Sequence, residues 1–231
     1  MATIAANIQQ VQERIAKACV LAKRDVRSVT LLAVSKTFPA AAVREAIACG
    51  LHRFGENYVQ EALEKIESLS EERSRLEWHM IGPLQSNKTR PVAEHFDWVH
   101  SVDRIKIAQR LSEQRPSTLP PLQVCLQVNI SGGASERGFK AGGRADAAPA
   151  IAGLPRLALR GLMAIPEPAG SIDAQREPHR ALRELRDSLN AGGLALDTLS
   201  MGMTADLEAA VLEGATMVRV GTAIFGQRDY G

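Results

Sequence analysis

Lys36 is the residue whose place in the sequence most favours covalent chemistry. It follows the apolar run 29–34 closely, and a strand over that run would leave the lysine amine partly desolvated at a strand end. Desolvation lowers the pKa of a lysine amine and frees it for attack on an aldehyde. Alternatively, Lys36 could simply extend its charged end into water at the edge of the fold. The spacing alone leaves both interpretations open.

Two glycine-containing segments near the C-terminus could bind an anion. Residues 217–220 predict a strand followed by Gly221 and Thr222, and residues 198–201 predict another strand followed by Gly202. Glycine lets the backbone approach an anion closely, and N–H groups of the following turn can donate to phosphate oxygens. Each segment alone could be an ordinary turn, and neither is a P-loop. The presence of two such loops favours a phosphate site.

Arg219 lies between two valines of the predicted strand 217–220. An arginine that points into an interior needs an anion, a hydrogen-bond acceptor or a ligand atom, because burying an unpaired charge is costly. Pairing with an acidic neighbour such as Glu56 would satisfy it equally well. The sequence therefore indicates a ligand contact for Arg219 without excluding an ion pair.

Several other kinds of site are disfavoured. The five histidines, at positions 52, 79, 95, 100 and 179, show no HxxxH or HExxH spacing, and there is no GxSxG elbow, so neither a metal site nor a serine triad is expected. Three widely spaced cysteines argue against a disulfide framework and fit a reducing compartment. A formal net charge of +2 favours neither nucleic acid nor an anionic membrane as a partner. We expect a cytoplasmic monomer.

The elements that must position these residues alternate along the chain between short apolar runs and amphipathic stretches. Eight apolar runs predict strands over residues 29–34, 53–55, 76–81, 98–101, 122–130, 157–165, 198–201 and 217–220. Helical stretches lie between them over residues 40–49, 58–67, 104–115, 173–190 and 205–213. Strands that alternate with helices pair in parallel, because a parallel neighbour requires a crossover connection.

Eight such units predict an α/β fold in which residues 28–231 form a (β/α)8 TIM barrel within a single domain of residues 1–231. An open doubly wound sheet is the competing arrangement. Functional residues of a barrel lie where its strands end. We therefore expect residues spread over the whole sequence to meet at one mouth.

An additional helix is predicted within residues 1–24. Apolar residues recur there at helical spacing, at Ile4, Ile8, Val11 and Ile15, as in an amphipathic helix docked on a core. Polar residues interrupt any apolar region of a signal peptide. No run of the sequence approaches the roughly 20 apolar residues of a membrane span.

Six segments of the sequence together resemble one known family. They are residues 33–37 (AVSKT), 54–61 (FGENYVQE), 78–88 (WHMIGPLQSNK), 161–166 (GLMAIP), 199–203 (LSMGM) and 218–226 (VRVGTAIFG). The resemblance is to the pyridoxal phosphate homeostasis proteins, whose fold is similar to the N-terminal barrel of alanine racemase, and it extends from about residue 33 to residue 230. The sequence departs from the family pattern at Thr204, Ala215 and Arg137, where serine, serine and lysine are common.

The resemblance implies that the barrel holds pyridoxal 5′-phosphate (PLP) as a Schiff base on Lys36. It implies a cofactor-binding set of Lys36, Asn57, His79, Ser200, Met201, Gly202, Arg219, Gly221 and Thr222. Ser200, Gly221 and Thr222 would hold the phosphate. Arg219 would face the pyridine nitrogen, while Asn57 and His79 would line the ring.

The function implied is PLP homeostasis: binding and storing the cofactor, buffering it and delivering it to apo-enzymes, with little or no turnover. Alanine racemase needs a second domain with an opposing tyrosine base, and this sequence ends at residue 231, shortly after the last predicted strand. A PLP-dependent amino-acid racemase or lyase is the alternative. It would require a second acid–base group facing Lys36, for which Tyr58 and His79 are the candidates. A sugar-phosphate aldolase is a third interpretation, which the resemblance disfavours.

Overall fold

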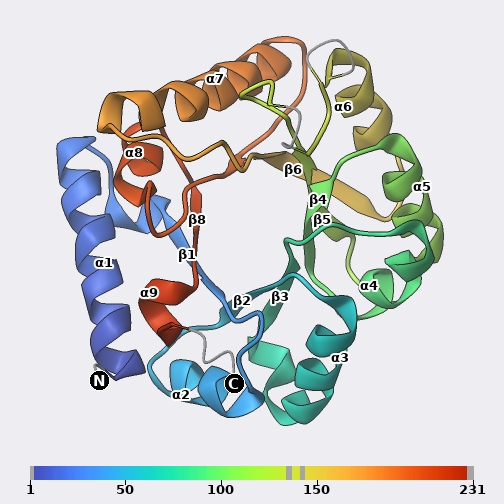
Figure 1. Ribbon diagram of the computed structural model, residues 1–231. Coiled ribbons are helices and arrows are strands. Elements are labelled where there is room, and N and C mark those ends of the chain that lie inside the picture. The colour runs from blue at the N-terminus through green and yellow to red at the C-terminus, as the bar shows by residue number, and fades with distance from the viewer. Residues whose placement is uncertain (1–2, 134–136, 141–143, 228–231) are drawn as a thin grey trace.

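Eight parallel strands close into one barrel in the computed structural model, which describes residues 3–133, 137–140 and 144–227 (Figure 1). In order around the barrel the strands are β1 (Thr30–Val34), β2 (Arg53–Glu56), β3 (Glu77–Met80), β4 (Trp98–Val102), β5 (Leu122–Gln127), β6 (Leu157–Met163), β7 (Thr198–Ser200) and β8 (Met217–Val220). Strand β1 pairs with both β2 and β8, which closes the sheet. The predicted TIM barrel is confirmed, and the open doubly wound alternative is wrong.

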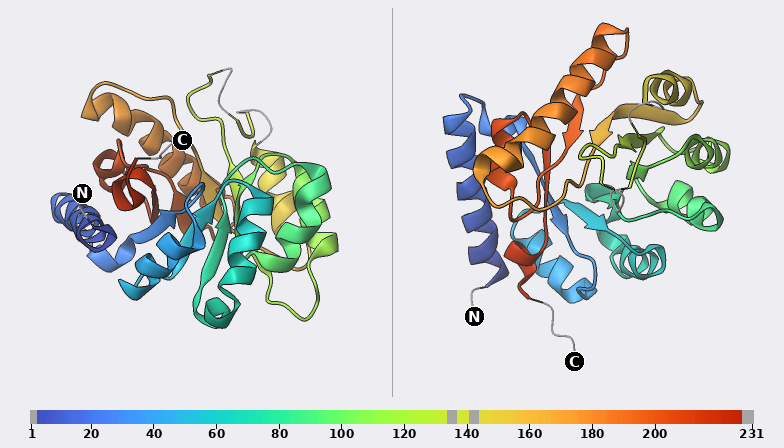
Figure 2. Two further views of the ribbon diagram at one scale, coloured as in Figure 1. Left: turned by 60° about the horizontal axis from the view of Figure 1, so that its bottom comes forward. Right: turned by 45° about the horizontal axis from the view of Figure 1, so that its top comes forward.

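Helices lie on the outside of the strands, as both views of Figure 2 show. The α-helices are α1 (Ile4–Leu21), α2 (Ala40–Ala48), α3 (Val59–Ser68), α4 (Thr89–His95), α5 (Ile105–Gln114), α6 (Arg144–Ala152), α7 (Ile172–Ala191), α8 (Leu207–Leu212) and α9 (Thr222–Phe225). Short 3-10 helices are η1 (Val26–Ser28), η2 (Ser70–Arg75) and η3 (Ser86–Lys88). None of these described helices combines the length and the apolar character that a membrane span requires.

The strands are rich in apolar residues because both of their faces are covered, by helices outside and by packed side chains inside. Strand β4 is buried along its whole length, although His100 and Ser101 within it are polar. Buried polar groups need hydrogen-bond partners. His100 finds them inside the barrel in His79 of β3 and Ser200 of β7.

Two of the predicted strands are too long by two or more residues at their C-terminal ends. Strand β5 ends three residues before the predicted limit of 122–130, because Val128 forms an isolated bridge with Phe139 outside the sheet. Strand β6 ends two residues before the limit of 157–165, ahead of Pro166, which has no N–H for a ladder. These early endings place the following residues in loops at the barrel mouth.

Helices α4 and α6 have no counterpart among the predicted elements. Each contains a proline, Pro91 in α4 and Pro149 in α6, and proline normally indicates a break in a helical pattern. Pro91 lies in the first turn of its helix, where no intrahelical N–H bond is lost. Pro91 is therefore compatible with helix α4.

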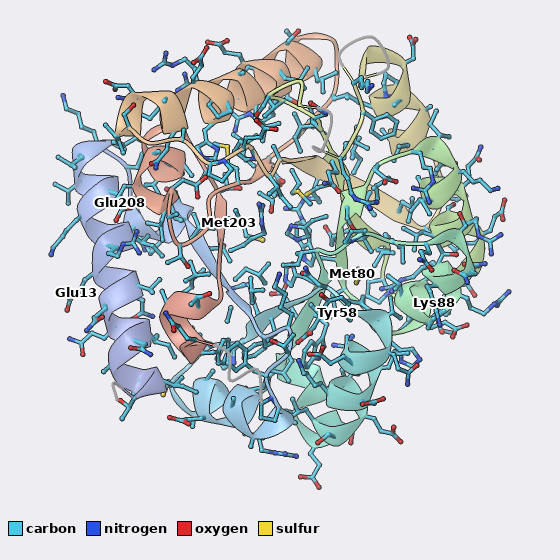
Figure 3. The ribbon with its side chains drawn as sticks, in the orientation of Figure 1. Glu13, Tyr58, Met80, Lys88, Met203 and Glu208 are labelled. Atoms are coloured by element: carbon cyan, nitrogen blue, oxygen red, sulfur yellow. The ribbon has the colours of Figure 1, made fainter. Side chains whose placement is uncertain are left out.

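The predicted additional helix is confirmed as α1, which lies beside α8 and α9 on the outside of the barrel (Figure 1). Arg14 of α1 forms an ion pair with Glu208 of α8 at 2.7 Å, and Figure 3 shows Glu208 on the side of α8 next to α1. Asn7 Nδ2 donates to the carbonyl oxygen of Ile224 in α9 at 2.9 Å. Helix α1 therefore fixes the two helices that follow β7 and β8.

Candidate cofactor site

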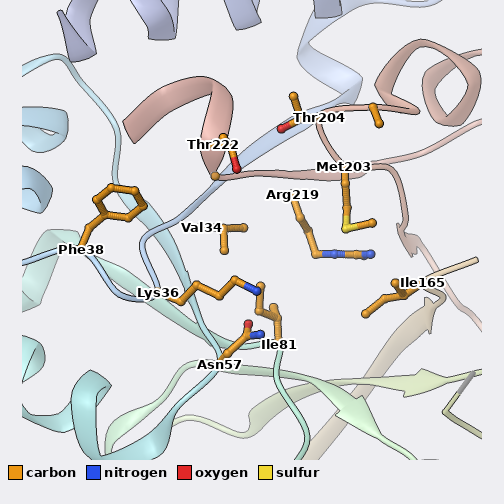
Figure 4. A pocket seen from close by; sticks show the side chains of 12 residues that line it. Val34, Lys36, Phe38, Asn57, Ile81, Ile165, Met203, Thr204, Arg219 and Thr222 are labelled. Carbon is orange, nitrogen blue, oxygen red and sulfur yellow. The ribbon is translucent and has the colours of Figure 1, made fainter. Parts of the chain in front are cut away.

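A cavity of about 300 Å³ lies at the end of the barrel where the strands terminate, a size typical of a small-molecule site. It is lined by Val34, Lys36, Phe38, Asn57, Ile81, Ile165, Met203, Thr204, Ala205, Arg219, Gly221 and Thr222. Figure 4 shows Lys36 extending its amine into the cavity, with Asn57 on one side and Arg219 across from it. The predicted convergence of distant segments at one mouth is confirmed.

The turn directly after Lys36 is held from two sides. Thr37 has a left-handed backbone with φ 68°, which is costly for a β-branched residue, and its N–H donates to Glu61 Oε1 of α3 at 2.6 Å. The next residue, Phe38, stacks on Phe225 of α9 with ring centroids 5.1 Å apart. These contacts hold the strained turn and so set the position of Lys36.

A buried ion pair lies behind this turn. Lys65 Nζ of α3 lies 2.8 Å from Glu56 Oε1 at the end of β2, and the two side chains are 5% and 0% exposed. Lys65 Nζ also donates to the carbonyl oxygen of Ser35 at 2.6 Å, and Ser35 Oγ donates to Glu56 Oε1 at 2.6 Å. Burial raises the pKa of Glu56 above its ordinary value, although Lys65 acts in the opposite direction. The ion pair thereby ties Ser35, the neighbour of Lys36, to α3.

Arg219 of β8 is buried, and only some of its N–H groups donate to protein acceptors. Its Nη1 donates to the carbonyl oxygen and the hydroxyl of Ser200 at 2.6 and 2.8 Å, and its Nη2 donates to the carbonyl oxygen of Ala164 at 2.9 Å. A guanidinium has five N–H groups, so the N–H of Nε and one N–H of Nη2 have no hydrogen-bond partner among the described residues. The pairing with Glu56 that the sequence left open is wrong, because Glu56 bonds to Lys65.

Gly221 brings the backbone at the start of α9 close to strand β1. A Cβ on Gly221 would lie 3.0 Å from the carbonyl oxygen of Val34, so the close approach depends on glycine. Figure 4 shows the hydroxyls of Thr204 and Thr222 at the same end of the cavity. Backbone N–H groups and two hydroxyls thus meet opposite the amine of Lys36.

Comparison with known proteins agrees with this geometry. The family of the alanine racemase N-terminal domain matches residues 1–229. The pyridoxal phosphate homeostasis protein of Pseudomonas aeruginosa is 63% identical over 231 residues, which cover 100% of this chain and 98% of that protein. The chain belongs to the pyridoxal phosphate homeostasis protein family. The resemblance seen in the sequence is therefore confirmed.

Further members of the family match over their whole length. The pyridoxal phosphate homeostasis protein of Escherichia coli is 52% identical over 231 residues, which cover 100% of this chain and 99% of that protein. The solved structure of PipY from Synechococcus elongatus, with PLP bound, has a TM-score of 0.82 and 39% identity, covering 94% of this chain and 100% of that chain. The barrel described here and that of PipY therefore share one architecture.

Five of the nine predicted cofactor residues line the cavity: Lys36, Asn57, Arg219, Gly221 and Thr222. The other four lie behind its wall. Ser200 and Met201 are fully buried, and a Cβ on Gly202, where φ is +91°, would lie 2.5 Å from Ala210 Cβ. This glycine therefore serves the turn toward α8.

His79 is also absent from the cavity lining, although the resemblance implies that it lines the ring. It is fully buried in the barrel interior, where its ring stacks on Trp98 with centroids 5.4 Å apart and its Nδ1 bonds to His100. The position of His79 near the end of β3 could be predicted from the sequence, but the direction in which its side chain points could not.

Sequence reasoning also missed residues that belong to the site. Phe38, Ile81, Ile165 and Met203 line the cavity, but apolar residues at strand ends look the same as core residues in a sequence. The ion pair of Glu56 and Lys65 was missed as well, since the pairing depends on how α3 packs on β2. The one usable sequence signal for a further cavity residue was Thr204, whose hydroxyl-bearing side chain directly follows the LSMGM segment.

Proposed function

We propose that this protein binds PLP covalently through Lys36 and takes part in intracellular PLP homeostasis. The support is that separate groups of the cavity match separate parts of the cofactor. Lys36 offers an amine to the aldehyde. Gly221 and Thr222 offer backbone N–H groups and a hydroxyl to the phosphate, in the loop after the eighth strand that often holds phosphate in barrels. Asn57 lies beside the space left for the ring.

Arg219 is the proposed partner of the pyridine nitrogen. PLP, when bound, supplies a ring that withdraws electrons, and a protein tunes this by what it places at the ring nitrogen. Burial lowers the pKa of Arg219 to about 10, so the guanidinium stays protonated at neutral pH. It can donate a hydrogen bond but cannot accept a proton. Arg219 would therefore keep the pyridine nitrogen unprotonated, and electron withdrawal by the ring would stay weak.

The composition of the cavity wall is the observation that favours a role in PLP storage over catalytic turnover. Lys36 and Arg219 are its titratable side chains among the residues described. Tyr58 is 56% exposed and lines a neighbouring pocket at the start of α3 (Figure 3), and His79 is buried in the barrel interior. A racemase or lyase needs a second acid–base group beside the reacting carbon. Neither of the two candidates from the sequence is in that place.

In this proposal the protein is a cytoplasmic monomer that holds PLP, limits the free aldehyde and passes the cofactor to apo-enzymes. The names of its relatives support a role in homeostasis. Its three cysteines, all within the described residues, are free, as is usual in a reducing compartment. The small net charge of +2 agrees with a partner set without nucleic acid or membrane.

Exchange of amino-acid α-protons with deuterated water tests the proposal. The PLP-loaded protein is expected to exchange them no faster than the same concentration of free PLP, because the described cavity wall offers no second base. The measurement is proton NMR over a panel of amino acids, with an alanine racemase as the positive control. The loaded protein is also expected to restore activity to an apo PLP enzyme. Steady exchange at enzymatic rates would instead support the racemase or lyase alternative.

The substitution Gly221→Ala tests the proposed phosphate contact. The new Cβ would lie 3.0 Å from a backbone oxygen of β1, so the turn must move and its N–H groups lose their positions. We expect PLP affinity to fall about tenfold, which corresponds to the lower range of overpacking costs. A titration followed by the visible absorbance of bound PLP measures this.

Gly153→Ala is the matched control, because its Cβ would meet its nearest atom only at 3.6 Å and the position is not part of the cavity lining. Thermal unfolding of both variants shows whether the fold is kept. Unchanged PLP affinity in a folded Gly221→Ala protein would contradict the assignment of the phosphate to this turn.

A further inference from the structure

Four polar side chains cross the barrel interior in an unbroken hydrogen-bonded series, which we call the interior network: Arg219, Ser200, His100 and His79. Arg219 Nη1 lies 2.8 Å from Ser200 Oγ, Ser200 Oγ lies 2.7 Å from His100 Nδ1, and His100 Nε2 lies 2.9 Å from His79 Nδ1. The members come from β8, β7, β4 and β3. The network therefore starts at the cavity wall and runs through the interior of the barrel.

Burial favours the neutral form of both histidines of the interior network. Burial lowers the pKa of His100 to about 3, with a further contribution from the charge of Arg219. Burial also lowers the pKa of His79 well below its ordinary value, assisted by His100 and Arg53. A neutral imidazole has one N–H donor and one acceptor nitrogen, so each ring must choose a direction within the network.

The two ends of the network select the same direction. At one end Arg219 can only donate, so Ser200 Oγ accepts from it, which leaves the hydroxyl proton available for donation to His100. At the other end His79 Nε2 is buried without a hydrogen-bond partner among the described residues and lies 4.0 Å from Glu77 Oε2. A proton on that nitrogen faces the carboxylate favourably, whereas a lone pair would be repelled. His79 Nδ1 is then an acceptor.

We propose that the interior network is directional, with Arg219 donating to Ser200, Ser200 to His100 and His100 to His79, and that His100 is a positioning residue for Arg219. His100 Nδ1 takes the proton of the Ser200 hydroxyl, so the oxygen lone pairs stay available to the guanidinium. This fixes which N–H groups Arg219 uses inside the protein and which it presents to the cavity. The effect on the bound cofactor rests on the proposed function, but the direction of the network does not.

Nitrogen-15 NMR of the protein labelled in histidine, without PLP, tests the direction. We expect both His100 and His79 to be neutral with the proton on Nε2 throughout the neutral pH range. Spectra of His100→Asn and His79→Gln proteins assign the two rings. A proton on Nδ1 of either ring, or a charged ring, would overturn the proposal. Since no cofactor is present, this result does not depend on whether the protein binds PLP.

Two substitutions at one position test the role of His100. His100→Leu removes the acceptor for Ser200, and we expect PLP to bind about tenfold more weakly, the upper end of the net contribution of one hydrogen bond between neutral groups, with a shifted visible band of the bound cofactor. In His100→Asn the amide oxygen can accept in place of Nδ1, so affinity and band are expected to match those of the unaltered protein. His95→Asn, on the outer helix α4, is the matched control.

Equal losses in His100→Leu and His100→Asn with an unshifted band would mean that His100 only fills space, and would overturn its positioning role. If His100→Leu fails to fold, Ser200→Ala removes the same hydroxyl from the network and is expected to shift the band in the same direction. An unshifted band in Ser200→Ala would also overturn the proposal. Failure of the unaltered protein to bind PLP would contradict the proposed function, while the NMR result would still decide the direction of the network.

Discussion

Replacing Lys36 with alanine is expected to abolish the covalent attachment of PLP and with it the visible absorbance of the loaded protein. Lys36 supplies the amine of the described cavity wall, and Figure 4 shows that amine directed into the cavity. An alanine there cannot bond to an aldehyde, whatever the rest of the cavity contributes. The effect is therefore a complete loss of the covalent bond.

Two measurements check this result. The absorbance spectrum after addition of PLP reports the colour, and borohydride reduction followed by mass spectrometry reports a stable adduct and its position. Lys106→Ala is the matched control, since Lys106 lies on the exposed side of α5. A reduced adduct on another lysine of Lys36→Ala, in the same amount as on the unaltered protein, would sink the assignment. An unaltered protein that stays colourless with PLP would remove the cofactor itself.

Weak binding of PLP should survive in Lys36→Ala. Gly221, Thr222 and Arg219 stay in place at the wall of the cavity, and the contacts proposed for them with phosphate and ring do not require the covalent bond. The variant should consequently compete with an apo-enzyme for PLP less strongly than the unaltered protein. This separates the contribution of the covalent bond from that of the non-covalent contacts.

Replacing Lys65 with methionine is expected to cause a large loss of stability, about 3–5 kcal/mol, because it leaves the buried carboxylate of Glu56 without a charge partner. For a protein of this size that corresponds to a fall in Tm of roughly 6–20 °C. The variant also releases Ser35, which Lys65 holds at 2.6 Å, so PLP affinity is expected to fall together with stability. Calorimetry and PLP titration measure the two effects.

The loss of stability in Lys65→Met should depend on pH in a defined direction. Burial already raises the pKa of Glu56, and Lys65 is the largest influence that lowers it, so removing Lys65 raises the pKa further. A carboxyl whose pKa is higher in the folded state than in the unfolded state loses stability as pH rises between the two values. The stability of Lys65→Met should therefore fall furthest below that of the unaltered protein at neutral pH. This stability deficit should shrink as pH falls toward the pKa of Glu56 in the unfolded state.

A double variant provides the control for this argument. Adding Glu56→Gln to Lys65→Met removes the unpaired charge while keeping a similar shape, so it should recover part of the lost stability and abolish the pH dependence of the deficit. Lys17→Met on the outer helix α1 controls for the loss of a lysine as such. A deficit that is the same at every pH, or a double variant that is no better than the single one, would contradict the charge-based explanation.

The sequence by itself determined the class of fold and indicated Lys36 as the candidate for covalent chemistry. Strands and helices follow from local patterns, because continuous apolar runs and helical periodicity are properties of neighbouring residues. The alternation of the two then leaves few topologies. Lys36, Arg219, Gly221 and Thr222 could be found for a related reason: they lie within short segments at strand ends, where a barrel places its site.

The tertiary structure decided which side chains meet. Glu56 could have paired with Arg219, yet it bonds to Lys65, because α3 packs its lysine onto the end of β2. His79 was expected at the ring but bonds to His100 inside the barrel. Such choices depend on residues far apart in the sequence that a closed barrel brings face to face. Hydrogen bonding and burial act only at these short distances, so the pairs they select exist only once the barrel has closed.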